Sequence, residues 1–177
     1  MRAIIAASLA GVALAAAWLA ADASATTTAE QRAAGFVRTA CLAAIKDPAG
    51  LERMAKDHDW TRLARRSTDQ PGAMTVIGTW EASQDGQVYL VTVATSRTRN
   101  GSQNICSVMF QNSRLTRSGF FAALTDGWTL TPRFDVKDAD LRDEMYSVAN
   151  VWPNELVLQM SSTGDGTVMG ITLLAAL

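Results

Sequence analysis

Histidine is nearly absent from this chain of 177 residues, which contains only His58. Catalytic zinc is usually held by two or three imidazole groups, so a typical zinc enzyme is excluded. His58 stands between two aspartates in the polar stretch Lys56–Trp60. It could act as a general base that a carboxylate orients. The position fits better with a surface histidine at a helix end, where a cation meets exposed carbonyl groups.

The common catalytic and nucleotide-binding motifs are missing as well. The sequence has no Gly-x-Ser-x-Gly, no Ser-x-x-Lys and no glycine-rich phosphate loop. Several carboxylates gather late in the chain, but they lack the order and the glycine of an EF-hand calcium loop: Asp135, Asp138, Asp140, Asp143 and Glu144. The sequence therefore predicts no catalytic residue, no metal ligand and no cofactor.

An excess of charge of either sign is also lacking, because the formal net charge is −1 at pH 7. Such a chain has no general electrostatic field that would attract nucleic acid or anionic lipid. The small arginine clusters along the chain are typical of solvated faces. We therefore expect no nucleic-acid partner.

Only the N-terminus carries a long apolar run. Ala3–Ala21 precedes the small residues Ala23-Ser24-Ala25, which is the layout of a secretory signal and its cleavage site. The run approaches the ~20 residues that span a bilayer, but alanine partitions poorly into lipid, so an uncleaved anchor is the alternative. We expect residues 1–25 to be a bacterial signal peptide. Residues 26–177 would then be periplasmic or secreted, with membrane association only if the signal stays uncleaved.

Cysteine is limited to Cys41 and Cys106. In an oxidising compartment two such thiols tend to form a disulfide. Cys41 lies on the apolar face of an expected helix and Cys106 inside an expected strand, so the bond would tie two layers together. It would also use up the best candidate nucleophiles of the chain. The alternative is a pair of buried, unpaired thiols.

Helical patterns occupy the part of the chain after the apolar run. Apolar residues recur at three- and four-residue spacing over Thr28–Ile45, which predicts an amphipathic helix. Either Thr27 with Glu30 or Thr28 with Gln31 would form the capping contact at its start. Pro48 suits the first turn of a second helix, with Asp47 as its cap. A third, short helix is expected over Ser118–Leu124, with Ser118 as its cap.

Strand patterns follow, separated by turns that tolerate positive φ, such as Asp85-Gly86. The segment Lys137–Val148 is compatible with a loop, a helix or a strand. In the second expected strand the alternation of apolar and polar residues does not decide which face is buried. Apolar residues occupy both even- and odd-numbered positions: Val88, Leu90, Val91 and Val93. The expected strands are Thr75–Glu81, Gln87–Ser96, Ile105–Gln111, Met145–Trp152, Leu156–Ser161 and Val168–Leu174, and Trp128–Val136 is expected to be extended around Pro132.

Helices followed by two runs of strands predict a single α+β domain over residues 26–177. Its antiparallel β-sheet would consist of two meanders. The N-terminal helices and the short middle helix would pack on one face of this sheet, and one disulfide would join the layers. The order of the strands and the oligomeric state do not follow from the sequence.

Four tryptophans lie outside the apolar run, each at the end of an expected element: Trp60, Trp80, Trp128 and Trp152. If several of them share one exposed face, they form a binding surface, because aromatic anchors dominate interfaces. The alternative is that they belong to the core or its edge.

The order of these features resembles that of small exported bacterial proteins of unknown function. The shared features are a signal, the inward Cys41, the pair Asp59-Trp60 and a mid-strand cysteine in Asn104–Val108. The resemblance implies a periplasmic or secreted domain and brings no activity with it.

The sequence favours a non-enzymatic exported domain that binds a protein or another macromolecule, as an accessory, inhibitor or immunity-type protein. One alternative is a carrier of a small hydrophobic ligand, in a pocket between helices and sheet lined by Phe36, Phe120 and Phe121. Another is a hydrolase whose site assembles from scattered aspartates, serines and His58.

Overall fold

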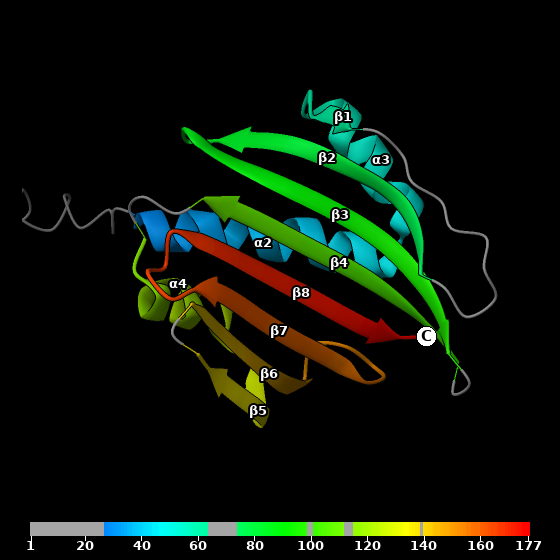
Figure 1. Ribbon diagram of the computed structural model, residues 1–177. Coiled ribbons are helices and arrows are strands. Elements are labelled where there is room, and N and C mark those ends of the chain that lie inside the picture. Colours follow the sequence, from blue (N-terminus) through cyan, green and yellow to red (C-terminus); the bar gives the residue numbers. More distant parts are fainter. Residues whose placement is uncertain (1–26, 64–73, 99–100, 112–114, 139) are drawn as a thin grey trace, which may run out of the picture.

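The computed structural model describes residues 27–63, 74–98, 101–111, 115–138 and 140–177, so the expected signal peptide lies outside the described residues. Within these ranges the chain forms three helices and one antiparallel sheet of eight strands (Figure 1). The α+β class is therefore confirmed. None of the described helices is long and apolar enough to cross a membrane.

Helix α2 (Ala29–Lys46) begins at a capping box. The Thr28 hydroxyl accepts a hydrogen bond from the Gln31 amide at 3.2 Å, and the Gln31 side chain accepts one from the Thr28 amide at 2.8 Å. These bonds satisfy amide groups that have no partner inside the helix. One face of α2 is buried, as the apolar spacing predicts: Ala33, Ala34, Val37, Ala40, Cys41, Ala44 and Ile45.

Helix α3 (Pro48–Asp57) follows directly and buries Leu51 and Ala55. Asp47 occupies the cap position, as expected, but its side chain makes no capping hydrogen bond; its carboxylate accepts from Arg53 Nη2 at 2.7 Å instead. A short edge strand, β1 (Thr61–Leu63), comes next. The sequence pattern does not predict β1, because three residues are too few to show a period.

Three long strands follow: β2 (Thr75–Gln84), β3 (Gln87–Thr98) and β4 (Gly101–Gln111). β2 and β3 pair through the turn Asp85-Gly86, whose φ angles of 53° and 75° are the left-handed values that a two-residue hairpin turn requires. All three strands extend further than the sequence predicts, because polar residues continue the pairing beyond the apolar ones.

Helix α4 (Arg117–Leu124) is capped by Thr116, whose hydroxyl accepts a hydrogen bond from the Gly119 amide at 3.2 Å. The prediction that Ser118 is the cap is wrong by two positions. Both residue types are good caps, so the sequence offers two starts and only packing decides between them.

Four further strands complete the sheet: β5 (Thr129–Lys137), β6 (Leu141–Ala149), β7 (Leu156–Thr163) and β8 (Val168–Ala176). The ambiguous segment Lys137–Val148 therefore contains the end of β5 and most of β6. In β6 Glu144 and Val148 are buried and lie opposite Met160 and Leu156 of β7, which fits the period of two that a strand requires.

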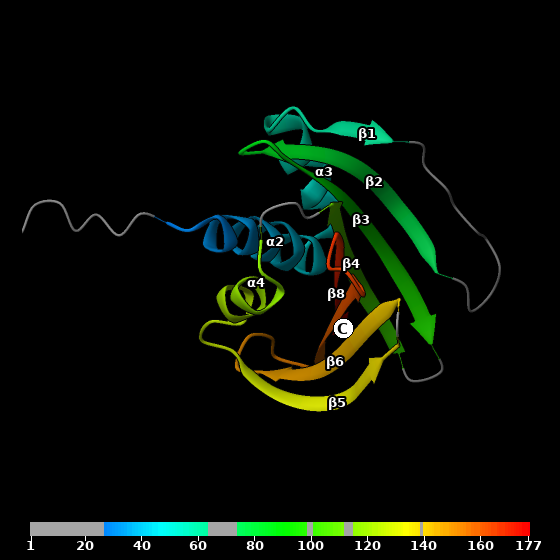
Figure 2. The same ribbon diagram turned by 60° about the vertical axis from the view of Figure 1, so that its left-hand side comes forward.

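The strands are ordered β1-β2-β3-β4-β8-β7-β6-β5. Each half of this order begins in the chain with a helical segment and continues with four strands, and β4 and β8 pair at the centre. The helices lie on one side of the twisted sheet, which we call the helix face (Figure 2). The other side carries no helix of the described residues, and we call it the open face; Figure 1 looks onto it, with α2 behind.

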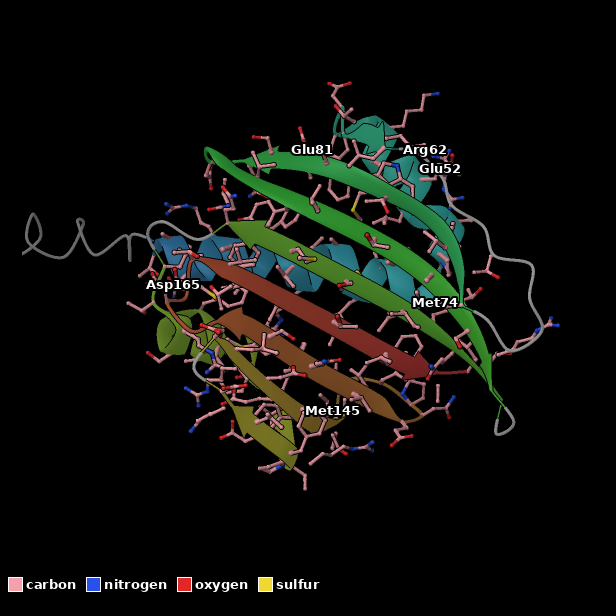
Figure 3. The ribbon with its side chains drawn as sticks, in the orientation of Figure 1. Glu52, Arg62, Met74, Glu81, Met145 and Asp165 are labelled. Atoms are coloured by element: carbon pink, nitrogen blue, oxygen red, sulfur yellow. A yellow bond between two sulfur atoms is a disulfide. The ribbon has the colours of Figure 1, made fainter. Side chains whose placement is uncertain are left out.

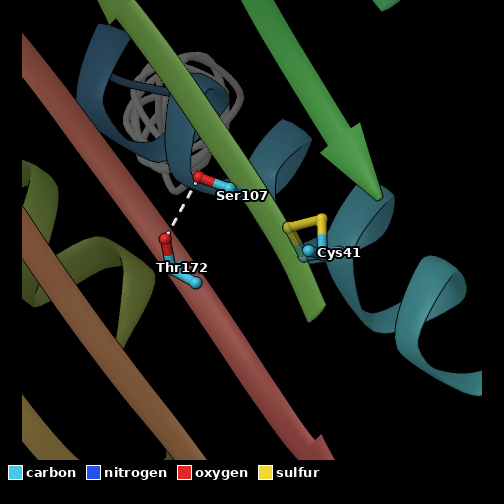
Figure 4. The surroundings of a disulfide bond; sticks show 4 residues. Cys41, Ser107 and Thr172 are labelled. Atoms are coloured by element: carbon cyan, nitrogen blue, oxygen red, sulfur yellow. Dashed lines mark hydrogen bonds between the residues drawn. A yellow bond between two sulfur atoms is a disulfide. The ribbon is translucent and has the colours of Figure 1, made fainter. Parts of the chain in front are cut away.

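Cys41 and Cys106 form the disulfide that the sequence predicts, with their Cα atoms 5.2 Å apart (Figure 4). The bond joins α2 to β4. Asn104 is buried on the same face of β4 and donates from Nδ2 to the Ile45 carbonyl oxygen at 2.8 Å. This oxygen belongs to the last turn of α2, where carbonyl groups lack partners inside the helix. Helix α2 is thus fixed to the sheet by a covalent bond and a hydrogen bond.

The core fills the space between the helix face and the helices, and its largest buried side chains include Trp80, Phe120, Ile45, Leu158, Ile171 and Leu173. The carboxylate of one ionic cluster is also buried there, whereas its two arginines are partly exposed. Glu144 of β6, with a side chain only 5% exposed, accepts Arg117 Nη2 at 2.6 Å and Arg142 Nη2 at 2.5 Å. Because Arg117 opens α4, the cluster ties this helix to the second half of the sheet.

Candidate functional site

Exposed apolar side chains gather on the open face. Successive side chains of a strand point to opposite sides of a sheet, so the pairing register assigns each residue to a face. Every exposed large hydrophobic residue that lies within a described strand belongs to the open face: Leu63, Val88, Leu90, Met109, Phe134, Val136 and Leu141. Scattered exposed apolar residues need no explanation, whereas large contiguous exposed patches are typical of surfaces that contact another molecule.

Three of these residues form one contiguous group, which we call the open-face patch: Val88, Leu90 and Met109. Leu90 and Met109 lie directly opposite each other on β3 and β4 and are 39% and 48% exposed. A hollow of about 810 Å³ opens beside the patch and is also lined by Glu81 of β2 and by Thr167 and Val168, where the chain enters β8. The patch therefore borders a depression that an apolar side chain of another molecule could enter.

Small residues separate the open-face patch from a second apolar group on β5 and β6. Along one row across the sheet, the residues that follow Met109 are Gly170, Ser161, Asp143 and Val136. A Cβ atom at Gly170 would lie 3.8 Å from Met109 Cγ, so any side chain there would extend over the patch. The row thus has large apolar side chains at both ends and shorter side chains between them. A protruding segment of a partner could fit over the shorter side chains.

The neighbouring row consists of hydrogen-bonding side chains. The hydroxyl oxygens of Thr79 and Thr92 lie 3.1 Å apart, and Thr172 donates to Ser107 at 3.1 Å (Figure 4). Gln159 continues the row on β7, opposite Thr172. Because the hydroxyl groups bond one another, the row is ordered, and each oxygen keeps acceptor capacity for a further donor.

The centre of the open face carries no charge. On β3, β4, β8 and β7 every described open-face side chain is neutral, although 19% of the residues in the chain are charged. Charged residues border this region: Glu81 of β2, labelled in Figure 3, lies directly opposite Leu90 and lines the hollow, and Asp143 lies on β6, the strand of the labelled Met145. Asp143 accepts hydrogen bonds from Gln159 Nε2 at 3.0 Å and Ser161 Oγ at 2.9 Å. Interface cores are depleted of charge in the same way.

The four tryptophans lie in or against the core. Trp80 is 2% exposed on the helix face, where Gly78 leaves room for its ring. Trp80 is therefore not available to an exposed binding surface, and the core alternative describes its position. The other three are partly buried and have different neighbours: Phe36 beside Trp60, Arg38 over Trp128, and the Ala176 carbonyl oxygen as acceptor for Trp152 Nε1.

The three phenylalanines expected to line one pocket have different neighbours and do not line a common pocket. Phe36 stacks on Tyr89 with ring centroids 4.2 Å apart, and Phe110 connects Tyr89 to the fully buried Phe120. Burial raises the pKa of Tyr89 to about 12, so the ring stays neutral within this aromatic series. Phe121 packs elsewhere, against Tyr146. Of the three phenylalanines, Phe36 alone lines a described cleft, the one between α2 and α3.

The titratable residues considered in the sequence do not meet at one site. His58 ends α3 and lies at the cleft beside Trp60. The late carboxylate cluster is divided by the sheet, since Asp143 points to the open face and Glu144 to the helix face. Among the residues that the structure describes, no group of three or more His, Cys, Asp or Glu side chains could hold a metal ion.

The open-face patch is not among the residues that the sequence singles out, although β3 contained a signal. The apolar residues at odd- and even-numbered positions of β3 belong to opposite faces of the sheet. Val91 and Val93 are buried, whereas Val88 and Leu90 are exposed. Met109 offers no such signal, since its position depends on how β4 pairs with its neighbours.

Comparison with known proteins identifies no relative. No family model, no curated protein and no solved structure matches the chain.

Proposed function

We propose that this chain is an exported, non-enzymatic protein that binds a protein partner through the open face, with Val88, Leu90 and Met109 at the centre of the contact. The observation that carries the proposal is the placement of all exposed large hydrophobic strand residues of the described chain on this one face. Such a surface costs solubility unless another molecule covers it.

The size of the face supports a stable contact. Eight strands of about nine residues, at spacings of about 4.8 Å and 3.3 Å, span about 1,100 Å². A standard protein–protein interface covers about 800 Å² on each partner. The open face can therefore accommodate a whole interface without a contribution from the helices.

The chemistry of the face indicates the kind of partner. A neutral, partly apolar surface fits a protein segment with aliphatic or aromatic side chains and few charges. The row of hydroxyl groups from Thr79 to Thr172 would serve the polar groups around such a segment. We expect the complex to depend little on salt, since screening acts on charged pairs.

The proposal also includes export to an oxidising compartment. The Cys41–Cys106 bond supports an oxidising compartment, which agrees with the signal expected in residues 1–25 and with a periplasmic or secreted location. The bond also occupies both thiols, so neither is available as a nucleophile. An accessory or inhibitor protein of the cell envelope fits these features.

Affinity capture with substituted chains tests the proposal. The double substitution Leu90→Asp and Met109→Asp places two charges in the contact and should abolish retention of the partner that the unmodified protein retains. Leu177→Asp, at an exposed position at the end of the chain, is the matched control and should retain it. Equal retention by all three proteins, with unchanged melting temperatures, would show that the open face does not bind the partner.

A further inference from the structure

A second surface feature lies on the helix side of the molecule, in a cleft of about 500 Å³ between α2, α3 and the end of β2. This volume falls within the range of roughly 300–1,000 Å³ that is typical of small-molecule sites. Its apolar lining comes from Phe36, Met54 and Trp60. The rings of Phe36 and Trp60 have centroids 5.5 Å apart and are inclined by 47°, so two aromatic surfaces border the cleft.

Gly35 lies in the lining of this cleft and in the interior of α2. Glycine at such a position disfavours the helix relative to alanine. Neither packing nor the backbone requires it, because a Cβ atom there would meet no atom within 4 Å and its φ is not in the left-handed region. Gly35 leaves a part of the cleft lining without a side chain, which a large residue at this position would fill.

The charged and titratable groups that line the cleft are basic. Arg32 lies at its rim, where Asp85 holds its Nε at 3.0 Å and the Thr27 carbonyl oxygen accepts from its Nη1. His58 lines the cleft as well, and no carboxylate is among its described lining residues. A flat apolar molecule with an anionic group would therefore find both an aromatic wall and a guanidinium donor.

We propose that the cleft beside Gly35 binds a small aromatic carboxylate, with the ring against Phe36 and Trp60 and the carboxylate toward Arg32. The site is separate from the protein contact proposed above, because no residue of the open-face patch lines the cleft. The two proposals can therefore fail independently.

Calorimetric titration of the exported protein, with its disulfide intact, tests this site with 2-naphthoate as the probe and 2-naphthamide as its neutral counterpart. Naphthoate should bind with a Kd below about 1 mM and naphthamide about tenfold more weakly, the loss of one charge-assisted contact. Arg32→Gln should reduce the affinity for naphthoate to that for naphthamide.

Substitutions at Gly35 locate the binding. Gly35→Trp should fill the cleft and abolish binding, whereas Gly35→Ala, the matched control, should retain it. The double substitution of Leu90 and Met109 should bind naphthoate as the unmodified protein does, which distinguishes this site from the partner surface. Should Gly35→Trp not fold, a shift of the Trp60 indole signal in the NMR spectrum on addition of naphthoate serves as the second measurement.

Three results would overturn the proposal. The first is no detectable binding of naphthoate at about 5 mM, well above the expected Kd. The second is equal affinity for naphthoate and naphthamide in the unmodified protein. The third is binding that persists in a folded Gly35→Trp variant or leaves the Trp60 signal unmoved.

Discussion

Cys106 and Ser107 are consecutive residues of β4 that serve opposite faces of the sheet. Cys106 is bonded to Cys41 of α2 on the helix face, and Ser107 accepts a hydrogen bond from Thr172 on the open face at 3.1 Å (Figure 4). One strand at the centre of the sheet thus supports both the stabilising layer and the proposed binding surface. The two properties can be changed separately by substitutions one residue apart.

Loss of the disulfide should destabilise the protein without changing the open face. The bond closes a loop of 65 residues in sequence separation, for which the chain-entropy model gives about 4 kcal/mol. We expect Cys41→Ala with Cys106→Ala to lower the free energy of unfolding by about this amount in urea titrations. A loss below about 1 kcal/mol would mean that α2 is held mainly by other contacts, such as that between Asn104 and Ile45.

Substitution of Glu144 should reduce stability in a pH-dependent manner. Burial raises the pKa of this carboxyl, but hydrogen bonds and charge from Arg117 and Arg142 outweigh burial, so the net pKa lies below 4.5. Because the pKa is lowered in the folded state, the stabilisation is present above pH 4.5 and is lost as the pH falls through the folded pKa.

We therefore expect Glu144→Gln to cost about 2–3 kcal/mol at pH 7, less than a fully buried pair because both arginines are partly exposed. The difference from the unmodified protein should shrink toward pH 3, which thermal unfolding across this range would measure. A difference that stays constant with pH would contradict an ionised Glu144 in the folded state.

Alanine substitutions at two glycines should change the stability of the protein in opposite directions. At Gly78 a Cβ atom would lie 2.5 Å from Trp80 Cη2, so Gly78→Ala must displace a buried ring and should cost about 1–3 kcal/mol. At Gly35 a Cβ atom meets no neighbour, so Gly35→Ala should stabilise α2 by about 0.5–1 kcal/mol. Melting temperatures of the two variants that shift in the same direction would contradict the packing described for one of them.

Local patterns explain which elements the sequence could predict. The turn Asp85-Gly86 depends on two residues that are adjacent in the chain, so its structure follows from those positions. The capping box at Thr28 is one of the two that the sequence allows, the other being Thr27 with Glu30. The disulfide also followed, because only one pairing was available. The start of α4 did not, since Thr116 and Ser118 are both acceptable caps.

The candidate site depends on contacts between distant segments, which local patterns do not report. The central pairing of β4 with β8 joins Ser107 to Thr172, residues far apart in the chain, and it decides that Met109 lies in the middle of the sheet. The sequence directed attention to the tryptophans instead. Trp80 is buried because Gly78 leaves space for its ring, and composition does not report such a relation.

Photo-cross-linking in the native host tests the central claim most directly, because it reports which face of the folded protein touches a partner. A photoreactive amino acid at Met109 or Gln159 lies on the open face, and one at the exposed Lys56 of α3 is the control on the other side. We expect Met109 and Gln159 to yield the same cross-linked protein and Lys56 to yield none. Cross-links from Lys56 alone would contradict the assignment of the open face as the binding surface.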